Sequence, residues 1–287
     1  MLADILDLLA DPNGEPLEFS EKGLHAHGRT YPIADAGYAI FLLEDTSEET
    51  SQGDDPAMLH AREAFLSRGH FAPFVEEVSA AVHDAIDEAG IPEEDTPVIC
   101  EIGAGTGYYL AHNLDEVYGA IGIGIDISSA AAEHLASCHP RVGAVVADAR
   151  QRLPLHDGVV DALTVIFSPH NAAECARVLA PTGQLIVLLP EPGHLKELRQ
   201  PLGIRDVEPG GVAEFREQAA EAGLVFAAEP RTIEFSMRLD RESIKAQIGM
   251  SPSARDIPED ELAERAAQLP PAMTVSAKAS LLRFRKS

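Results

Sequence analysis

The region that begins at Val98 places the strongest constraint on the fold, because short apolar segments alternate there with segments of helical spacing. This alternation is typical of a parallel sheet with helices on both faces, so we expect an α/β fold. A late pair of strands, near 233–239 and 274–284, is expected to return to the sheet edge and complete a seven-stranded core. The other predicted strands span 98–102, 119–127, 143–147, 162–167 and 184–189, and late helices lie near 212–222, 241–248 and 258–268.

A glycine-rich loop directly follows the first predicted strand and reads Glu101-Ile102-Gly103-Ala104-Gly105-Thr106-Gly107. Glycine at alternate positions lets the backbone turn sharply and approach a ligand where a Cβ atom would clash. The next two strands end at Asp126 and Asp148, and a carboxylate at the first of these positions can accept hydrogen bonds from both hydroxyls of a ribose. Each acid alone could be a helix cap, but their order on consecutive strand ends favours cofactor binding. The Gly-x-Gly-x-x-Gly pattern of NAD enzymes is absent.

The chain is expected to have three parts, at 1–43, 44–95 and 96–287. The first reads as a small β-rich unit, with a short helix at 5–9 and hairpins around Lys22-Gly23 and His27-Gly28. Segment 44–55 has six acidic residues and no apolar ones, which predicts a solvated linker. Helices near 57–67 and 71–89 lead to the main domain. The core of the first part is expected to contain Leu17, Phe19, Leu24, Tyr31 and Ile33.

Charge and cysteine content restrict the partners and the compartment. With 22 basic and 47 acidic residues, the formal net charge of −25 opposes a polyanionic partner. Cys100, Cys138 and Cys175 are far apart and odd in number, which suits reduced thiols in a cytoplasmic protein. The N-terminus lacks the pattern of a signal peptide, and no apolar run reaches the roughly 18 residues that a membrane span needs.

The loop and the two acids resemble the first motifs of class I (Rossmann-like) methyltransferases. In those enzymes the loop lies against the methionine part of S-adenosylmethionine, and the acid after the third strand meets the adenine amine. Segment 177–187 similarly resembles their helix, turn and fifth strand. The resemblance implies that S-adenosylmethionine is the cofactor, bound by Glu101, Gly103, Ala104, Gly105, Gly107, Tyr109, Asp126, Ile127, Asp148, Ala149 and Phe167.

A narrower resemblance, across most of the chain, is to the bacterial 23S ribosomal RNA guanine-N1 methyltransferases, which include macrolide-resistance enzymes. It implies that Arg62 and His70 close over the methionine end of the cofactor. The matching segments are 35–43, Gly53-Asp54-Asp55 with Met58, 61–73, Phe167-Ser168-Pro169, 190–198 and Met250-Ser251-Pro252-Ser253.

That family opens with a small zinc module, in which Cys-Pro-x-Cys is followed by a further cysteine and a histidine. In this chain Asp11 stands at the first of these positions, and no cysteine occurs before Cys100. A tetrahedral zinc site needs four deprotonated ligands, for which Asp11, His25 and His27 are a poor set. We therefore expect residues 1–43 to be a zinc-ribbon-like module that lacks its zinc ligands and holds no metal.

The segment after the fourth strand, where this fold presents the methyl acceptor, reads Phe167-Ser168-Pro169-His170-Asn171. We expect Phe167 and Pro169 to pack on the acceptor ring, and Ser168 or Asn171 to form a hydrogen bond with it. Guanine N1 carries a proton, so a nearby base would help to remove it. His170 and His194 are the candidate bases.

Three functions remain open from the sequence. The first is methylation of 23S ribosomal RNA without the metal. The second is methylation of a small-molecule or lipid-linked acceptor, which the net charge and the missing zinc ligands favour. The third is a non-catalytic regulator that binds S-adenosylmethionine, which the intact loop and acids disfavour. A homodimer is considered as well.

Overall fold

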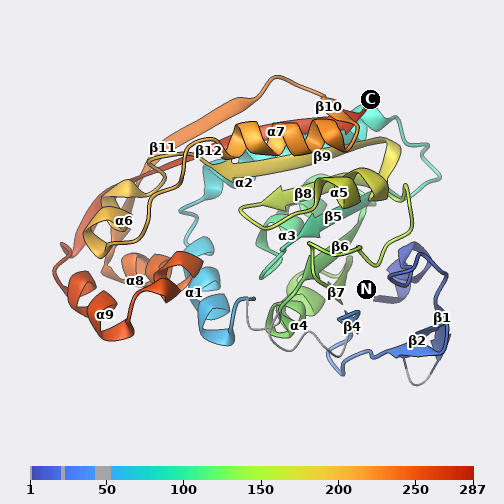
Figure 1. Cartoon of the computed structure of the whole chain (residues 1–287), viewed down its shortest axis with the longest axis horizontal. Helices are drawn as coiled ribbons and strands as arrows, with labels where there is room; N and C mark the ends of the chain where they lie inside the picture. Colours follow the sequence, from blue (N-terminus) through green and yellow to red (C-terminus); the bar gives the residue numbers. More distant parts are fainter. Residues whose placement is uncertain (1, 21–22, 43–52) are drawn as a thin grey trace.

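The computed structural model describes residues 2–20, 23–42 and 53–287, and a twisted sheet forms its centre (Figure 1). The strand order is β10-β12-β9-β8-β5-β6-β7-β4, and β11 pairs with β12 beside β10. Strands β4 to β9 pair in parallel, whereas β12 runs antiparallel to its three neighbours. The strands are β4 (Ala39–Ile40), β5 (Val98–Ile102), β6 (Ile121–Asp126), β7 (Val142–Val146), β8 (Val160–Ile166), β9 (Leu179–Pro190), β10 (Leu224–Phe226), β11 (Arg231–Asp240) and β12 (Ala272–Lys286).

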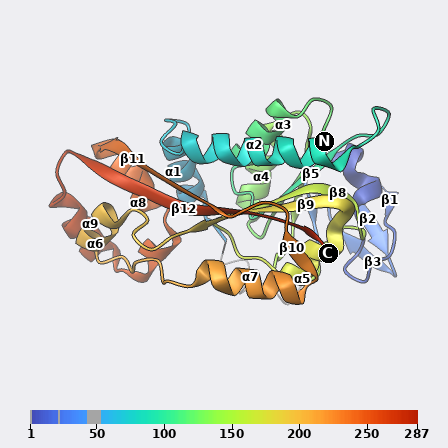
Figure 2. The same ribbon diagram turned by 90° about the horizontal axis from the view of Figure 1, so that it is seen from above.

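Helices cover both faces of this sheet (Figure 2), as alternating strands and helices predict. Every residue of β5 is buried, and its side chains alternate between the two faces. Ile99 joins the hydrophobic cluster under α2 and α3, whereas Cys100 and Ile102 join the cluster under α5 and α7. The helices of the sheet are α2 (Ala72–Ala89), α3 (Tyr108–Glu116), α4 (Ser129–Cys138), α5 (Ala172–Val178) and α7 (Gly211–Glu221).

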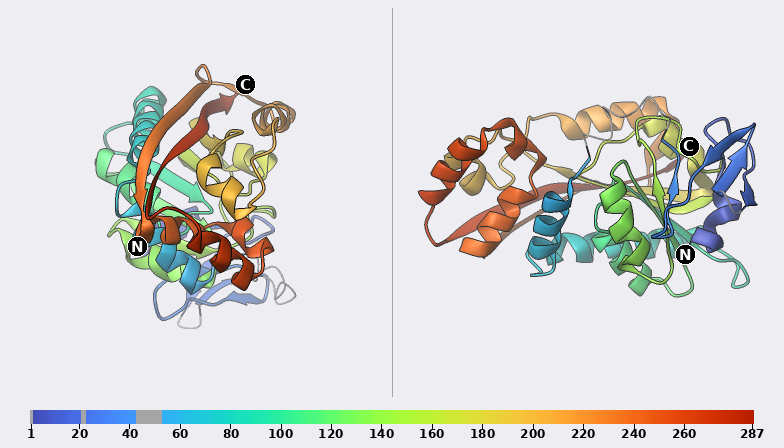
Figure 3. Two further views of the ribbon diagram at one scale, coloured as in Figure 1. Left: turned by 90° about the vertical axis from the view of Figure 1, so that its left-hand side faces the viewer. Right: turned by 90° about the horizontal axis from the view of Figure 1, so that it is seen from below.

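The far ends of β11 and β12 extend beyond the sheet into a second lobe (Figures 1 and 3). Polar contacts of Arg68 and His70, in the segment after α1, join this segment to the lobe. Arg68 Nη1 donates to Asp240 Oδ1 at 3.0 Å, and His70 Nε2 shares a 2.8 Å hydrogen bond with Ser243 Oγ. This segment follows α1 (Pro56–Leu66), and the lobe carries α6 (Lys196–Leu202), α8 (Arg241–Gly249), the 3-10 helix η3 (Pro252–Asp256) and α9 (Glu259–Ala267).

The first part of the chain shares its core with the sheet. Its elements are the 3-10 helix η1 (Leu2–Leu8) and the strands β1 (Glu18–Ser20), β2 (Gly23–Ala26) and β3 (Arg29–Tyr31). Ile5 is fully buried against Gly143 of β7, and Tyr31 stacks on Phe41 in the same hydrophobic cluster. The described part of 1–43 is therefore not a separate packing unit, contrary to expectation, and the domain boundaries remain predictions.

The structure confirms some of the other predicted elements and core positions and contradicts others. The expected strands from 98 onward and the seven-stranded core with its returning pair are confirmed. The expected core position of Phe19 is wrong, because this side chain is 67% exposed on the outer face of β1. The elements β4, β10 and α6 were not predicted, since each is too short for a periodic pattern to emerge. The predicted linker lies outside the described residues up to 52. Of the last three residues of this segment, Gly53 and Asp54 are half-buried and Asp55 is exposed, as predicted for a solvated segment.

No helix within the described residues has the length and apolar character needed to cross a bilayer.

We expect Ile5→Ala to lower the free energy of unfolding by about 2–4 kcal/mol, because it leaves a cavity between η1 and β7. Phe19→Ala removes a larger but exposed side chain and should cost less than about 1 kcal/mol. Urea unfolding followed by circular dichroism measures both. A cost for Phe19→Ala equal to that for Ile5→Ala would contradict the shared core.

Candidate active site

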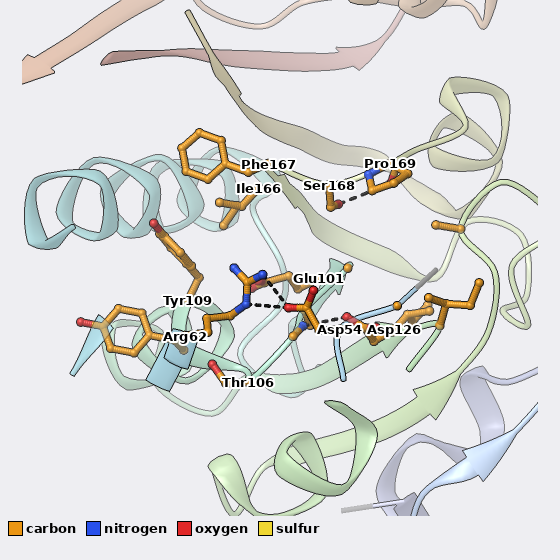
Figure 4. Close-up of a pocket in the computed structure, with 18 of the residues that line it drawn as sticks. Asp54, Arg62, Glu101, Thr106, Tyr109, Asp126, Ile166, Phe167, Ser168 and Pro169 are labelled. Carbon is orange, nitrogen blue, oxygen red and sulfur yellow. Dashed lines mark hydrogen bonds and ion pairs between the residues drawn. The ribbon is translucent and has the colours of Figure 1, made fainter. Parts of the chain in front are cut away.

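A cavity of about 440 Å³ opens where β5, β6, β7 and β8 end (Figure 4). This edge is where open α/β sheets bind ligands, because the loops after parallel strands meet there. The lobe supplies a further wall through Met250 and Pro252. The predicted cofactor residues that line the cavity are Arg62, Glu101, Gly103, Ala104, Gly105, Tyr109, Asp126, Ile127, Asp148, Ala149 and Phe167.

The glycine-rich loop is held in a conformation that side chains disfavour. Gly103, Gly105 and Gly107 have φ angles of 68°, 55° and 76°, in the left-handed region. The N–H of Gly103 donates to the carbonyl of Ile125 at 2.8 Å, which fastens the loop to β6. The side chain of Ser168 occupies the space that a Cβ atom on Gly103 would need. The loop is thus fixed between β6 and the segment after β8.

Asp126 connects the loop to the start of α4. Its Oδ2 accepts from the N–H of Gly105 and its Oδ1 from the N–H of Ser128, both at 2.9 Å. Burial raises the pKa of Asp126, and these two hydrogen bonds partly oppose that rise. Each carboxylate oxygen keeps a further lone pair, which suits a ribose diol.

Asp148 is buried at the end of β7 and is held by Arg150. Its Oδ1 accepts from the backbone N–H and Nε of Arg150 at 2.9 and 3.0 Å, and its Oδ2 accepts from Nη2 at 3.0 Å. Burial alone would raise the pKa of Asp148, but the hydrogen bonds and charge of Arg150 lower it. The carboxylate therefore stays ionised and can accept from a ligand amine.

Glu101 and Tyr109 contribute buried polar atoms to the cavity. Within the described residues, Oε2 of Glu101 and the hydroxyl of Tyr109 have no hydrogen-bond partner. Burial raises the pKa of Glu101 well above its usual value. A buried polar atom without a partner costs about 1–3 kcal/mol, so a ligand that satisfies both atoms is favoured. The ammonium and carboxylate of S-adenosylmethionine offer a donor and an acceptor, so the residues present fit this cofactor.

Aromatic and apolar side chains wall the cavity beside β8. Phe167 and Pro169 line it together with Phe71. Phe167 has a φ of 52°, a left-handed conformation that costs a residue with a Cβ atom about 1–2 kcal/mol. Packing maintains it, since the Phe167 ring lies 5.7 Å from Phe74 and 6.3 Å from Phe71 between centroids. Strained residues of this kind cluster at functional sites.

Two polar residues of this segment have structural partners instead of facing an acceptor. Ser168 lines the cavity, but its hydroxyl donates to the carbonyl of Ile102 at 2.7 Å. Asn171 lies outside the cavity and caps α5, where its Oδ1 accepts from the N–H of Ala173 at 3.1 Å. The expected hydrogen bond between Asn171 and the acceptor is therefore not supported by its position.

Neither candidate base lines the cavity. The ring of His170 packs on Phe215, 4.6 Å away between centroids. His194 lies behind Phe71 and Phe167, and its Nδ1 is 2.9 Å from the carbonyl oxygen of Lys278. Burial lowers the pKa of His194 to about 4. This histidine is therefore neutral near pH 7. The phenyl rings of Phe71 and Phe167 pack against it, so it is part of the core.

Two predicted cofactor residues also lie outside the cavity lining. Gly107 begins α3, where Cys138 and Leu135 leave no room for a Cβ atom. His70 bonds Ser243 of the lobe instead of the cofactor site.

The cavity also contains residues that the site prediction missed, among them Gly53, Asp54, Met250 and Pro252. They come from elements far from the glycine-rich loop in sequence. Their segments were visible only as part of the family resemblance, because nothing in their spacing points to a ligand.

Comparison with known proteins agrees with this geometry. Residues 100–187 match the family model described as "Methyltransferase domain", so the fold and site define a methyltransferase. A 23S rRNA (guanine(748)-N(1))-methyltransferase of Streptomyces fradiae is 36% identical, over 89% of this chain and 88% of its own length. A candidate 23S rRNA (guanine-N1) methyltransferase of Micromonospora griseorubida is also 36% identical, over 90% and 88%. Another candidate of this kind, YxjB of Bacillus subtilis strain 168, is 30% identical over 82% and 81%.

The chain belongs to the family of 23S rRNA (guanine-N1) methyltransferases. It is an S-adenosylmethionine-dependent methyltransferase with the class I fold.

We expect Gly103→Ala to weaken binding of S-adenosylhomocysteine and to destabilise the fold, because the new Cβ atom strains the backbone and displaces Ser168. Gly158 is a matched control, since its φ of 72° is similar but no backbone or side-chain atom lies closer than 3.8 Å to its Cβ position. Gly158→Ala should cost about 1 kcal/mol of stability and leave ligand binding unchanged. Calorimetric titration measures the ligand affinity of the two variants, and urea unfolding measures their stability. Equal affinity of Gly103→Ala and Gly158→Ala for the ligand would contradict this interpretation of Gly103.

His194 should make the stability of the fold depend on pH under acid conditions. The unfolded chain takes up this proton near pH 6.5 and the folded chain near pH 4, so stability falls as the pH drops between these values. The loss is at most about 1.4 kcal/mol per pH unit. The difference in unfolding free energy between wild type and His194→Gln should therefore narrow from pH 7 to pH 5. An unchanged difference would argue against a neutral, buried His194.

Proposed function

We propose that this chain methylates N1 of a guanine in 23S ribosomal RNA. The relatives named for that reaction support the acceptor. The observation that carries the proposal is the wall of Phe167, Pro169 and Phe71 beside the glycine-rich loop. A base taken out of the RNA stack is commonly held against such apolar and aromatic side chains.

The proposed roles follow from the lining of the cavity. Asp126 accepts hydrogen bonds from the ribose hydroxyls of S-adenosylmethionine, and Asp148 accepts one from its adenine amine. The amino-acid end of the cofactor is held by Glu101, Tyr109 and Arg62. When bound, S-adenosylmethionine supplies a methyl group on a positively charged sulfur. As the bond from guanine N1 to the methyl carbon forms and the methyl–sulfur bond breaks, N1 loses its proton; because neither candidate histidine lines the cavity, this proton passes to water. The task of the chain is then alignment, because in-line transfer requires the acceptor nitrogen to face that methyl group. Phe167 fixes the plane of the acceptor base.

A second candidate function is methylation of a small-molecule or lipid-linked acceptor. The net charge of −25 favours it, since a strongly acidic protein repels RNA at long range. The homodimer, the cytoplasmic location and the absence of metal remain predictions.

The acceptor is tested by transfer of labelled methyl from S-adenosylmethionine to unmodified 23S RNA, beside a small-metabolite extract. We expect label at N1 of a guanine, which blocks the Watson–Crick edge and stops reverse transcription. Asp126→Ala should abolish the labelling. Label confined to the extract would overturn the ribosomal acceptor in favour of the second candidate.

Phe167→Ala should remove about 1–3 kcal/mol of transition-state stabilisation, the usual contribution of one stacked base. The value of kcat/KM for RNA should fall by the corresponding factor. Tyr118→Ala is the control, because Tyr118 is a 99% exposed aromatic residue outside the cavity lining. Steady-state kinetics with RNA as the varied substrate measures both variants. Equal activity of the two would remove the proposed stacking role of Phe167.

A further inference from the structure

Residues 53–55 form a short strap beside the cofactor cavity, just before α1. Gly53 lies against the start of α4, where a Cβ atom would approach the Cβ of Ser128 to 2.9 Å. The carbonyl of Asp54 accepts from Ser128 Oγ at 2.7 Å. Because the N–H of Ser128 donates to Asp126, the strap is fixed next to the proposed ribose site.

The side chain of Asp54 forms an ion pair with Arg62 at the cavity wall (Figure 4). Asp54 Oδ2 accepts from Arg62 Nε at 2.9 Å and from Nη2 at 2.5 Å. The two side chains are only 16% and 24% exposed, so water screens them less than a surface pair. In the described part of the chain, Oδ1 of Asp54 and Nη1 of Arg62 make no hydrogen bond.

Oδ1 of Asp54 is therefore an unused acceptor, and Nη1 of Arg62 an unused donor, at the wall of the cavity. Of the described residues that line the cavity, Arg62 and Arg150 are the cationic ones. Arg150 is bound to Asp148 at the proposed adenine end. Arg62 lies instead beside the glycine-rich loop, with its Cδ 3.5 Å from the Cβ position of Gly105, where the amino-acid end of the cofactor is expected.

The proposed placement of the cofactor brings its amino-acid end toward this pair. Asp126 and Asp148 hold the nucleoside at the ends of β6 and β7. The opposite end of the ligand then points toward α1 and the strap, where Arg62 and Asp54 line the cavity.

We propose that Asp54 binds the ammonium of S-adenosylmethionine, beside Arg62, which the proposed function already places at the amino-acid end and which takes the carboxylate. Asp54 is then a specificity-determining residue of the methyltransferase. The pair and the zwitterion are each neutral overall, so binding joins two complementary dipoles without leaving a net charge in the cavity. Hydrogen bonds between charged groups are shorter and stronger than those between neutral ones. The inference rests on the cofactor placement in the proposed function, and it is independent of the acceptor.

The test is calorimetric titration of the full chain with two ligands, S-adenosylhomocysteine and 5′-methylthioadenosine, which lacks the amino-acid end. Asp54→Asn should weaken S-adenosylhomocysteine about tenfold, as expected for the loss of one charged hydrogen bond. Its affinity for 5′-methylthioadenosine should stay that of the wild type. Arg62→Gln should behave in the same way.

Asp55→Asn is the matched control. Asp55 lies on the same strap, but its Oδ1 caps α1 through the N–H of Met58 and its Oδ2 pairs with Arg255, away from the cavity lining. Asparagine is an equally good helix cap, so this variant should bind both ligands normally. Thermal unfolding of all variants checks that they are folded.

A third ligand separates the two roles within the pair. Decarboxylated S-adenosylhomocysteine keeps the ammonium, so its binding should still depend on Asp54 and no longer on Arg62. If Asp54→Asn weakens the binding of S-adenosylhomocysteine and of 5′-methylthioadenosine by the same factor, the proposal is overturned. The ion pair would then only stabilise the conformation of the strap. Unchanged or tighter binding of S-adenosylhomocysteine would overturn the proposal as well. If Asp126→Ala fails to weaken 5′-methylthioadenosine, the assumed nucleoside placement is wrong, which is a separate result.

Discussion

The site depends on how the glycine-rich loop is held between its two neighbours. Ser168 fills the space where Gly103 has no side chain, and Asp126 accepts the N–H of Gly105. Through these contacts the ends of β5, β6 and β8 form one rigid edge. The cavity, the strained Phe167 and the start of α4 all take their positions from it. The buried carboxylate of Asp126 therefore has two roles: it holds the loop in place, and its remaining lone pairs can bind a ligand.

The parts of the fold that were predictable have local causes. A strand buried on both faces, such as β5, is almost entirely apolar, with Glu101 as its one polar residue, and a loop with left-handed backbone favours glycine. The helix α6 of the lobe was harder to predict from sequence, because it follows Leu195, which has a left-handed backbone, and contains Pro201. The position of the lobe depends on contacts such as Arg68 with Asp240, which join residues far apart in sequence. No local pattern encodes such contacts.

The structure brings some of the predicted site residues together at the cavity and leaves others outside it. Residues at strand ends, such as Asp126 and Asp148, were found because topology alone brings strand ends together. Asp54 and Met250 were missed, since tertiary folding delivers them from other elements. His170 and His194 were chosen for the chemistry of imidazole, without knowledge of their surroundings. Burial among phenyl rings gives His194 a packing role that its residue type does not reveal.

The shared core of the N-terminal segment has a consequence for how that segment keeps its shape. A small β-rich module that stands alone needs a metal or disulfides to hold its shape, because it buries too little apolar surface. Here Ile5 and Tyr31 are anchored in the cluster beneath the main sheet, so the main domain provides that support. This support comes from apolar contacts, so it does not require a metal at Asp11 or its neighbours. A substitution on the outer face of the module, for example at the exposed Phe19, leaves these contacts intact.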